Sequence, residues 1–120
     1  MLIGVAGLIS SCGGNNTEEM PEALLPPEKM VGVLIDIYQT EAMIASFGQN
    51  YDSSQHIYDI VEPDLLARHE TNHEDFSSSY RYYLDRPDQL ILIYSAVVDT
   101  LSYREQVLTQ ERDKNNADSK

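Results

Sequence analysis

The apolar positions of this 120-residue chain recur at the spacing of α-helices, and no stretch alternates for long enough to predict a β-strand. The first helical stretch runs from Pro27 to Phe47, with Pro27 at its first position and Gly48 as a C-terminal cap. Five residues are predicted to face inward: Met30, Val33, Leu34, Ile37 and Ile44. The pattern therefore predicts a long amphipathic first helix.

Two shorter helices are expected next. Residues 49–56 are polar and loop-like, and a helix is predicted from Val61 to Glu70, with Pro63 in its first turn. Val61 and Leu65 are expected to face inward. Residues 71–74 read Thr-Asn-His-Glu, which fits the capping box that starts a helix. A third helix is therefore predicted from there to about Leu84.

A fourth helix is predicted to begin near Pro87, after the break at residues 85–87. Its apolar stripe consists of Leu90, Ile93, Tyr94, Val97, Leu101 and Leu108. Residues 110–120 are polar and are expected to fray. The predicted fold is all-α, a small bundle of three to four helices at residues 26–109, followed by a polar tail at residues 110–120.

The N-terminus has the pattern of an export signal. Residues 1–9 form an uncharged apolar run, and Ile9-Ser10-Ser11-Cys12 resembles the lipobox of bacterial lipoproteins. We expect residues 1–11 to be a lipoprotein signal peptide and Cys12 to carry a covalent lipid. Residues 12–25 would then be a lipidated tether. The segment before Cys12 lacks Lys and Arg, which is consistent with a start codon upstream of Met1.

A lipidated Cys12 indicates a location and a membrane contact. Two or three acyl chains hold a domain stably on a bilayer, whereas one chain does so only marginally. We therefore expect an outer-membrane lipoprotein of the bacterial cell envelope that faces the periplasm or the cell surface. Cys12 is the only cysteine, so a multi-thiolate zinc site is excluded. A Cys–His nucleophile pair is excluded as well, because the single thiol is the expected lipid site.

The net charge of -12 excludes another class of partner. Through Ala67 the chain has ten acidic residues and one basic residue, a net of -9, and the remainder has ten and seven, a net of -3. Nucleic-acid binding depends on Lys and Arg that displace counterions from phosphates, so no nucleic-acid partner is expected. The acidic surface is typical of a soluble, well-solvated small domain.

One carboxylate lies on the predicted apolar stripe. At 100° per residue, Glu41 falls between Met30, Leu34 and Ile37 on the first helix. A carboxylate buried there needs hydrogen-bond donors. The nearest candidates lie on the third helix: Tyr80, Arg81, Tyr82 and Tyr83. Two interpretations stay open, a buried ion pair that docks two helices and one wall of a small-ligand pocket.

The string from His69 to His73 reads His-Glu-Thr-Asn-His and matches the H-E-x-x-H pattern of zinc peptidases. That chemistry needs both histidines on one turn of an unbroken helix. Thr71 favours a helix start inside the string, so we expect His69 and His73 to lie on either side of a helix boundary. A zinc hydrolase is therefore the third and weakest functional hypothesis.

Two groups of residues together resemble a lipoprotein family of the Bacteroidota. The first group is Pro26-Pro27-Glu28-Lys29-Met30, Val33-Leu34, Asp36-Ile37 and Glu41-Ala42. The second is Phe76, Ser79-Tyr80-Arg81-Tyr82-Tyr83, Pro87, Leu90, Ile93-Tyr94, Val97 and Leu101. This combination is similar to the family catalogued as domain of unknown function 4296, over about residues 25–106. The resemblance implies an envelope lipoprotein with a helical domain and implies no activity.

Surplus apolar residues favour one functional class. Six residues are expected to point away from the core: Ile35, Met43, Phe47, Ile91, Leu92 and Tyr103. A minimal bundle cannot cover both faces of two long helices, so a partner protein or a second copy would cover them. We expect a non-catalytic, lipid-anchored domain without a cofactor that binds an envelope protein or forms a homodimer. A small-ligand-binding lipoprotein using Glu41 and the tyrosines is the alternative.

Overall fold

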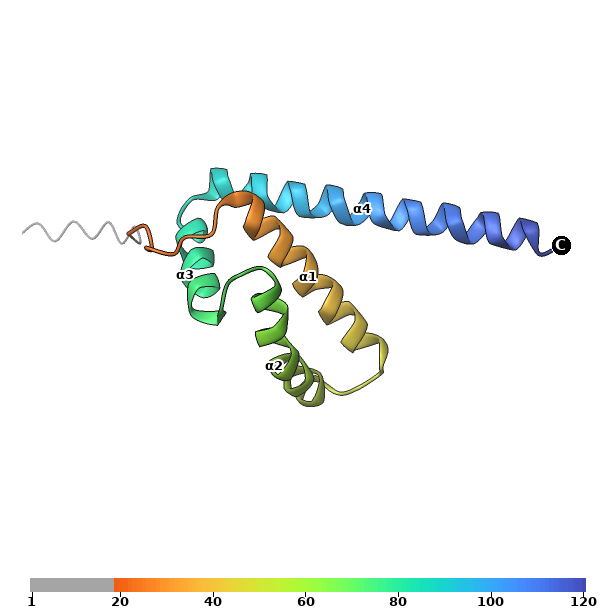
Figure 1. Ribbon diagram of the computed structural model, residues 1–120, viewed down its shortest axis with the longest axis horizontal. Coiled ribbons are helices and arrows are strands. Elements are labelled where there is room, and N and C mark those ends of the chain that lie inside the picture. The colour runs from red at the N-terminus through yellow and green to blue at the C-terminus, as the bar shows by residue number, and fades with distance from the viewer. Residues whose placement is uncertain (1–18) are drawn as a thin grey trace, which may run out of the picture.

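The computed structural model describes residues 19–120, and this part of the chain is helical. Its elements are α1 (Pro27–Ser46), α2 (Tyr51–Arg68), α3 (His73–Leu84) and α4 (Pro87–Asp118) (Figure 1). The all-α prediction is confirmed. The predicted signal peptide and Cys12 lie outside the described residues. Within residues 19–120, no helix combines the length and the apolar character needed to cross a membrane.

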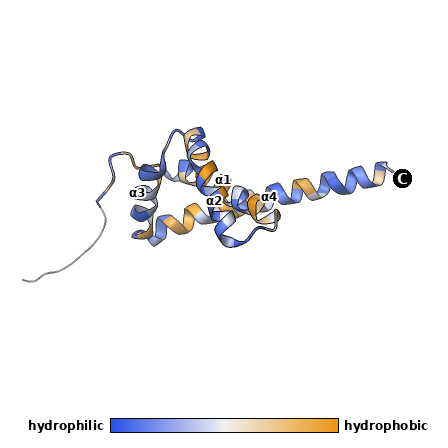
Figure 2. Cartoon of the chain, turned by 90° about the horizontal axis from the view of Figure 1, so that it is seen from below, coloured by the Kyte–Doolittle hydropathy of each residue, from blue (hydrophilic) through white to orange (hydrophobic). Residues whose placement is uncertain are grey.

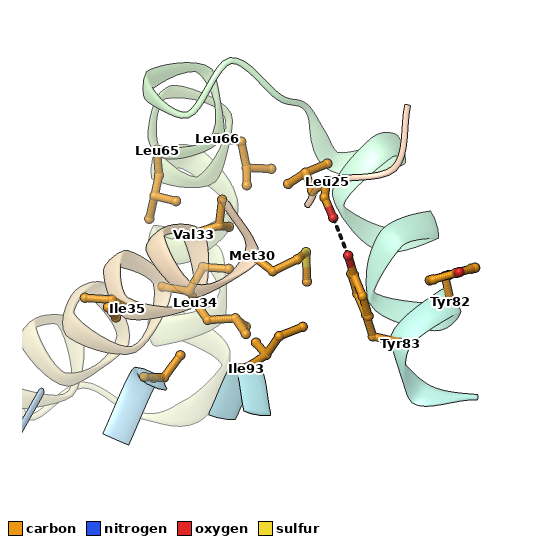
Figure 3. Close-up of a cluster of buried hydrophobic side chains, with 12 residues drawn as sticks. Leu25, Met30, Val33, Leu34, Ile35, Leu65, Leu66, Tyr82, Tyr83 and Ile93 are labelled. Carbon is orange, nitrogen blue, oxygen red and sulfur yellow. Dashed lines mark hydrogen bonds between the residues drawn. The ribbon is translucent and has the colours of Figure 1, made fainter. Parts of the chain in front are cut away.

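The four helices form a closed ring of contacts. Helix α1 packs on α2 and on α4, and α3 packs on the same two helices (Figure 1). The core lies inside this ring, where α1 and α2 contribute aliphatic side chains, α3 contributes Tyr82 and Tyr83, and α4 contributes Ile93 and Val97 (Figure 3). A helix contacted on two sides needs a broad apolar face, which is what the first helix has.

The predicted inward face of α1 is confirmed, and the buried face is wider than expected. All five predicted residues are buried, and Met30 and Val33 are fully enclosed. Ile35 is also buried, so the prediction that it points outward was wrong. The reason is that α2 and α4 cover α1 from two directions. Gly48 has a φ of 69°, a left-handed conformation that glycine adopts without steric cost, and its N–H bonds the Ala45 carbonyl at 3.1 Å.

The segment before α1 is fixed to α3 by its backbone. The Leu25 N–H donates to Oγ of Ser79 at 2.9 Å, and the Tyr83 hydroxyl donates to the Leu25 carbonyl at 2.7 Å (Figure 3). Ser79 is fully buried and donates in turn to the Asp75 carbonyl. We call this arrangement the Leu25 clamp. It brings Leu25, at the end of the predicted tether, into the hydrophobic core.

Helix α2 begins ten residues earlier than predicted, so the expected loop at residues 49–56 was wrong. Asn50 caps the helix, because its Oδ1 accepts the Ser53 N–H at 2.9 Å, and Asp52 lies in the first turn. Pro63 is inside α2 rather than in its first turn. The helix accommodates the proline although it loses one backbone hydrogen bond there.

The connection between α2 and α3 also differs in detail from the prediction. Asn72, not Thr71, is the N-cap of α3, and its side chain accepts the Asp75 N–H at 2.9 Å. Glu70 adopts a left-handed φ of 55°, and the N–H of Thr71 bonds back to the Leu66 carbonyl at 3.1 Å. This pattern closes α2 in the same manner as a glycine-terminated helix.

Helix α4 extends far beyond the bundle. Residues 110–118, predicted to fray, continue the helix, because residues 88–118 contain no Gly or Pro and many strong helix formers. Every residue after Val107 is exposed, and the hydropathy changes from largely apolar to largely polar along the helix (Figure 2). Leu108, predicted on the buried stripe, is 59% exposed because α1 does not reach it.

Candidate functional site

A pocket of about 250 Å³ lies where side chains from all four helices meet. Aromatic rings make up most of its wall: Tyr38 of α1, Tyr58 of α2, Phe76 and Tyr80 of α3, and Tyr94 of α4. Leu34 and Ile37 of α1 provide an aliphatic floor, and Glu41 stands at its edge. We call it the tyrosine pocket. In this pocket a carboxylate, several phenol hydroxyls and an apolar floor adjoin one hollow.

Three hydroxyl groups are linked inside this pocket. The Tyr38 hydroxyl donates to the Tyr94 hydroxyl at 3.2 Å, and the hydroxyls of Tyr80 and Tyr94 are 2.6 Å apart. The ring centroids of Tyr38 and Tyr94 are 6.5 Å apart, and those of Phe76 and Tyr80 are 6.1 Å apart. Both distances are typical of interacting aromatic pairs. The network therefore joins α1, α3 and α4 across the pocket.

Burial and neighbouring side chains keep two of the pocket tyrosines, Tyr58 and Tyr94, protonated. Burial, followed by Glu62 and Glu41, raises the pKa of Tyr58 to about 12. Burial also raises the pKa of Tyr94 well above its ordinary value, with further contributions from the hydroxyls of Tyr38 and Tyr80. Tyr58 and Tyr94 are therefore neutral hydrogen-bonding groups at physiological pH.

A second hollow of about 350 Å³ adjoins the first between α1 and α2. Glu41 and Tyr58 line both, so they stand at the junction. The second hollow adds the aliphatic side chains of Ile44 and Ala45 and the polar side chains of Ser54 and Gln55. No Lys, Arg or His lines either hollow.

The structure corrects the predicted environment of Glu41. Glu41 is exposed rather than buried. Arg81 is exposed as well, and its Nη2 lies 3.5 Å from Oγ of Ser78 on its own helix. The buried ion pair between Glu41 and Arg81 is therefore wrong. Of the four predicted donors, only Tyr80 lines the same pocket as Glu41.

Tyr82 and Tyr83 have other roles. Tyr83 is buried and forms part of the Leu25 clamp, and burial raises its pKa. The Tyr82 ring packs edge-on against Tyr83, with centroids 5.3 Å apart, and the Arg86 guanidinium lies 3.5 Å from the centroid of the Tyr82 ring. These two tyrosines stabilise the contact of α3 with the start of α1.

The H-E-x-x-H string spans a helix boundary, as predicted. His69 is the C-cap of α2 and His73 is the first residue of α3. Nε2 of His69 lies 2.7 Å from Oδ2 of Asp36, and Nδ1 of His73 lies 2.7 Å from Oε1 of Glu62. Each histidine therefore has its own carboxylate partner and links two helices. Within residues 19–120, no group of three or more His, Cys, Asp or Glu side chains is placed to hold a metal ion.

Exposed apolar side chains gather at both ends of the bundle. Met43 and Phe47 are exposed at the end of α1, and Ile91, Leu92 and Tyr103 are exposed on α4, as predicted for all five. Val98 and Leu108 of α4 add to them. Cys12, the predicted lipidation site, lies outside the described residues.

Sequence reasoning missed most of the tyrosine pocket. Tyr38, Tyr58 and Tyr94 were not assigned to a site, although Tyr38 and Glu41 are three residues apart and share one side of a helix. That spacing is a local signal that could have been found. Tyr58 could not, because the polar composition of residues 49–56 predicts a loop and leaves the helix register of α2 undefined.

The comparisons with known proteins give a family and no activity. Residues 21–107 match the family model described as "Domain of unknown function (DUF4296)". No curated protein and no solved structure matches the chain. The matched range covers the whole ring of four helices and the Leu25 clamp, and it ends where α4 leaves the bundle. The chain belongs to the DUF4296 family.

Proposed function

We propose that this chain is a non-catalytic, lipid-anchored domain of the bacterial cell envelope that binds a partner protein through the second half of α4. The observation that carries the proposal is an apolar stripe that continues beyond its intramolecular partner. Ile93 and Val97 are buried in the bundle, and Leu108, which lies on the same stripe, is exposed. A helix of a partner protein that packs on α4 beyond its contact with α1 would cover Leu108.

The energetics of helix formation support a partner at this position. Most of the stability of a helix in a protein comes from packing of its apolar face. An isolated helix as short as the uncovered end of α4, residues 108–118, is marginal in water. Leu101 and Val107 are half-buried, Leu108 is exposed, and no later residue of α4 is covered. We call Val107 and Leu108 the α4 seam, whereas Leu101 packs against the chain's own core.

Charge distinguishes the seam region from the rest of the chain. Residues 102–120 contain four basic and four acidic side chains, a net of zero, so residues 1–101 carry the whole excess of -12. The second half of α4 thus has no net charge, so another protein, including an acidic one, meets no net repulsion there. A second copy of this acidic bundle would be repelled by residues 1–101, which carry the net charge of -12.

The proposal is tested by site-specific photo-crosslinking in the native bacterium. A photoreactive amino acid at position 108 is expected to give a discrete cross-linked product that is absent with the same group at position 106. Gln106 is the matched control, because it is exposed on the same helix and lies on the opposite face. Leu108→Asp combined with the probe at Val107 is expected to remove the product, whereas Gln106→Asp is expected to retain it.

Two results would contradict the proposal. Equal cross-linking at positions 106 and 108 would show a non-specific surface. A cross-linked product with twice the mass of the chain and no other protein in it would show that the partner is a second copy of this chain.

The lipid anchor is tested separately. Cys12→Ala is expected to move the protein from the membrane fraction to the soluble fraction, and mass spectrometry of the wild-type N-terminal peptide is expected to show a diacylglyceryl group on Cys12. An unmodified Cys12 in membrane-associated protein would contradict this part of the proposal.

A further inference from the structure

The tyrosine pocket has the chemistry of a binding site for a positively charged organic group. Five aromatic side chains line it, and the faces of such rings attract cations. Its floor is aliphatic, with Leu34 and Ile37 both buried. An apolar floor beneath polar and aromatic walls suits a ligand with a hydrocarbon part and one polar end.

The charged side chains that line the pocket have a single sign. Glu41 is the only carboxylate that lines it, and Glu62 and Asp59 lie close enough to Tyr58 to act on it electrostatically. The linings of both hollows contain no cationic side chain. An anionic ligand would therefore be repelled.

Glu41 is available to a ligand. Among residues 19–120 its carboxylate makes no ion pair and no hydrogen bond with another side chain, whereas Asp36 and Glu62 are each paired with a histidine. A carboxylate at the junction of two hollows, beside neutral phenol groups, can accept hydrogen bonds from an ammonium group.

We propose that the tyrosine pocket binds a small primary alkylammonium ion, whose ammonium group contacts Glu41 and the tyrosine rings and whose alkyl chain lies along Leu34 and Ile37. Longer chains would enter the adjoining hollow beside Ile44 and Ala45. This site is independent of the α4 seam, because neither Val107 nor Leu108 lines the pocket.

The test is a titration of residues 19–120 or the full chain, monitored by NMR, with butylammonium and with 1-butanol as the uncharged analogue. Butylammonium is expected to bind at least about five-fold more tightly, because ring faces and a carboxylate each add a modest attraction for the charged group. The largest chemical-shift changes are expected at Tyr38, Tyr58 and Tyr94. Equal affinities for the two compounds would overturn the proposal.

Two pairs of variants separate the charge and the rings. Glu41→Gln is expected to weaken butylammonium binding about five-fold, and Glu111→Gln, which removes the same charge from an exposed site on α4, is expected to leave it unchanged. Tyr38→Phe keeps the ring face and is expected to retain binding, whereas Tyr38→Leu removes the face and is expected to weaken it. Tyr38 is 37% exposed at the rim, so both variants are expected to fold, which circular dichroism checks. Equal butylammonium affinities for Glu41→Gln and Glu111→Gln, or for Tyr38→Phe and Tyr38→Leu, would overturn the proposal.

Discussion

Helices α1 and α4 are the two longest elements of the bundle, and they differ in how much of their length is covered. Helix α1 has 20 residues, six of them buried, and contacts neighbours on two sides. Helix α4 has 32 residues and only two buried ones, Ile93 and Val97. The two helices start at the same end of the molecule and diverge (Figure 1), so α1 leaves α4 uncovered from Leu108 onward.

The difference shows that an apolar stripe indicates a packing surface of a helix, whether the partner that covers it belongs to the same chain or to another one. On α1 the stripe is covered throughout the bundle. On α4 the same spacing continues to Leu108, where no other part of residues 19–120 covers it. Four substitutions can break or sharpen this comparison.

The largest effect is expected from truncation of one stripe position in the covered half of α4. Ile93→Ala removes a side chain that is 1% exposed, and it is expected to lower the free energy of unfolding by about 2–5 kcal/mol. Leu108→Ala, on the same stripe, is expected to change it by less than about 0.5 kcal/mol. Urea unfolding of both variants measures the contrast. Similar losses would show that the second half of α4 is covered in solution.

The next effect concerns the Leu25 clamp at the start of α1. Tyr83→Phe removes the hydroxyl that donates to the Leu25 carbonyl and leaves a buried acceptor without its donor. The free energy of unfolding is expected to fall by about 1–3 kcal/mol. Tyr103→Phe removes the same atom from an exposed position on α4 and serves as the control. A neutral result for Tyr83→Phe in thermal unfolding would mean that the clamp is not formed.

Alkaline pH tests the packing of α2 against α1. An unfolded tyrosine has a pKa near 10, and that of Tyr58 in the folded chain is raised to about 12. Below pH 10 both states are protonated and the stabilisation is complete. Between pH 10 and 12 the unfolded state loses its proton first, so stability falls as pH rises. Tyr58→Phe is expected to flatten this fall in chemical unfolding at pH 9, 10 and 11. An unchanged slope would contradict the raised pKa.

The smallest effect is expected at the end of α2. Glu70 has a left-handed φ of 55°, which costs free energy for any residue with a Cβ atom. Glu70→Gly is expected to raise the free energy of unfolding by about 0.5–1 kcal/mol. Glu70→Ala is the control, because it also loses the exposed contact with Lys29 at 3.7 Å but keeps the Cβ atom. A gain in both variants would point to charge rather than backbone strain.

Strong local signals allowed much of the fold to be predicted. Pro27, Gly48 and a regular apolar spacing defined α1, and Pro87 marked the start of α4. The start of α2 was missed because Asn50 is a cap without an apolar run directly after it. The C-terminal part of α4 was missed because a polar composition was interpreted as fraying, although its residues favour helix.

The candidate site was less predictable, because it depends on where helices end relative to one another. Glu41 lies on the apolar side of α1, and its spacing alone indicated burial. Its exposure depends on how the other helices are placed around α1, which the spacing within α1 does not show. Tyr58 and Tyr94 join Glu41 only through the packing of three helices. The periodicity within a single segment does not show which side chains of other helices lie beside it.

The Leu25 clamp also determines how the domain bears mechanical load. Because both backbone polar groups of Leu25 are bonded to α3, a pull on the chain before this residue is transmitted to Ser79 and Tyr83 rather than to the first turn of α1. The two bonds and the buried Leu25 side chain resist that pull together. The bundle can therefore be held by its N-terminal segment under tension without α1 being unwound from its end.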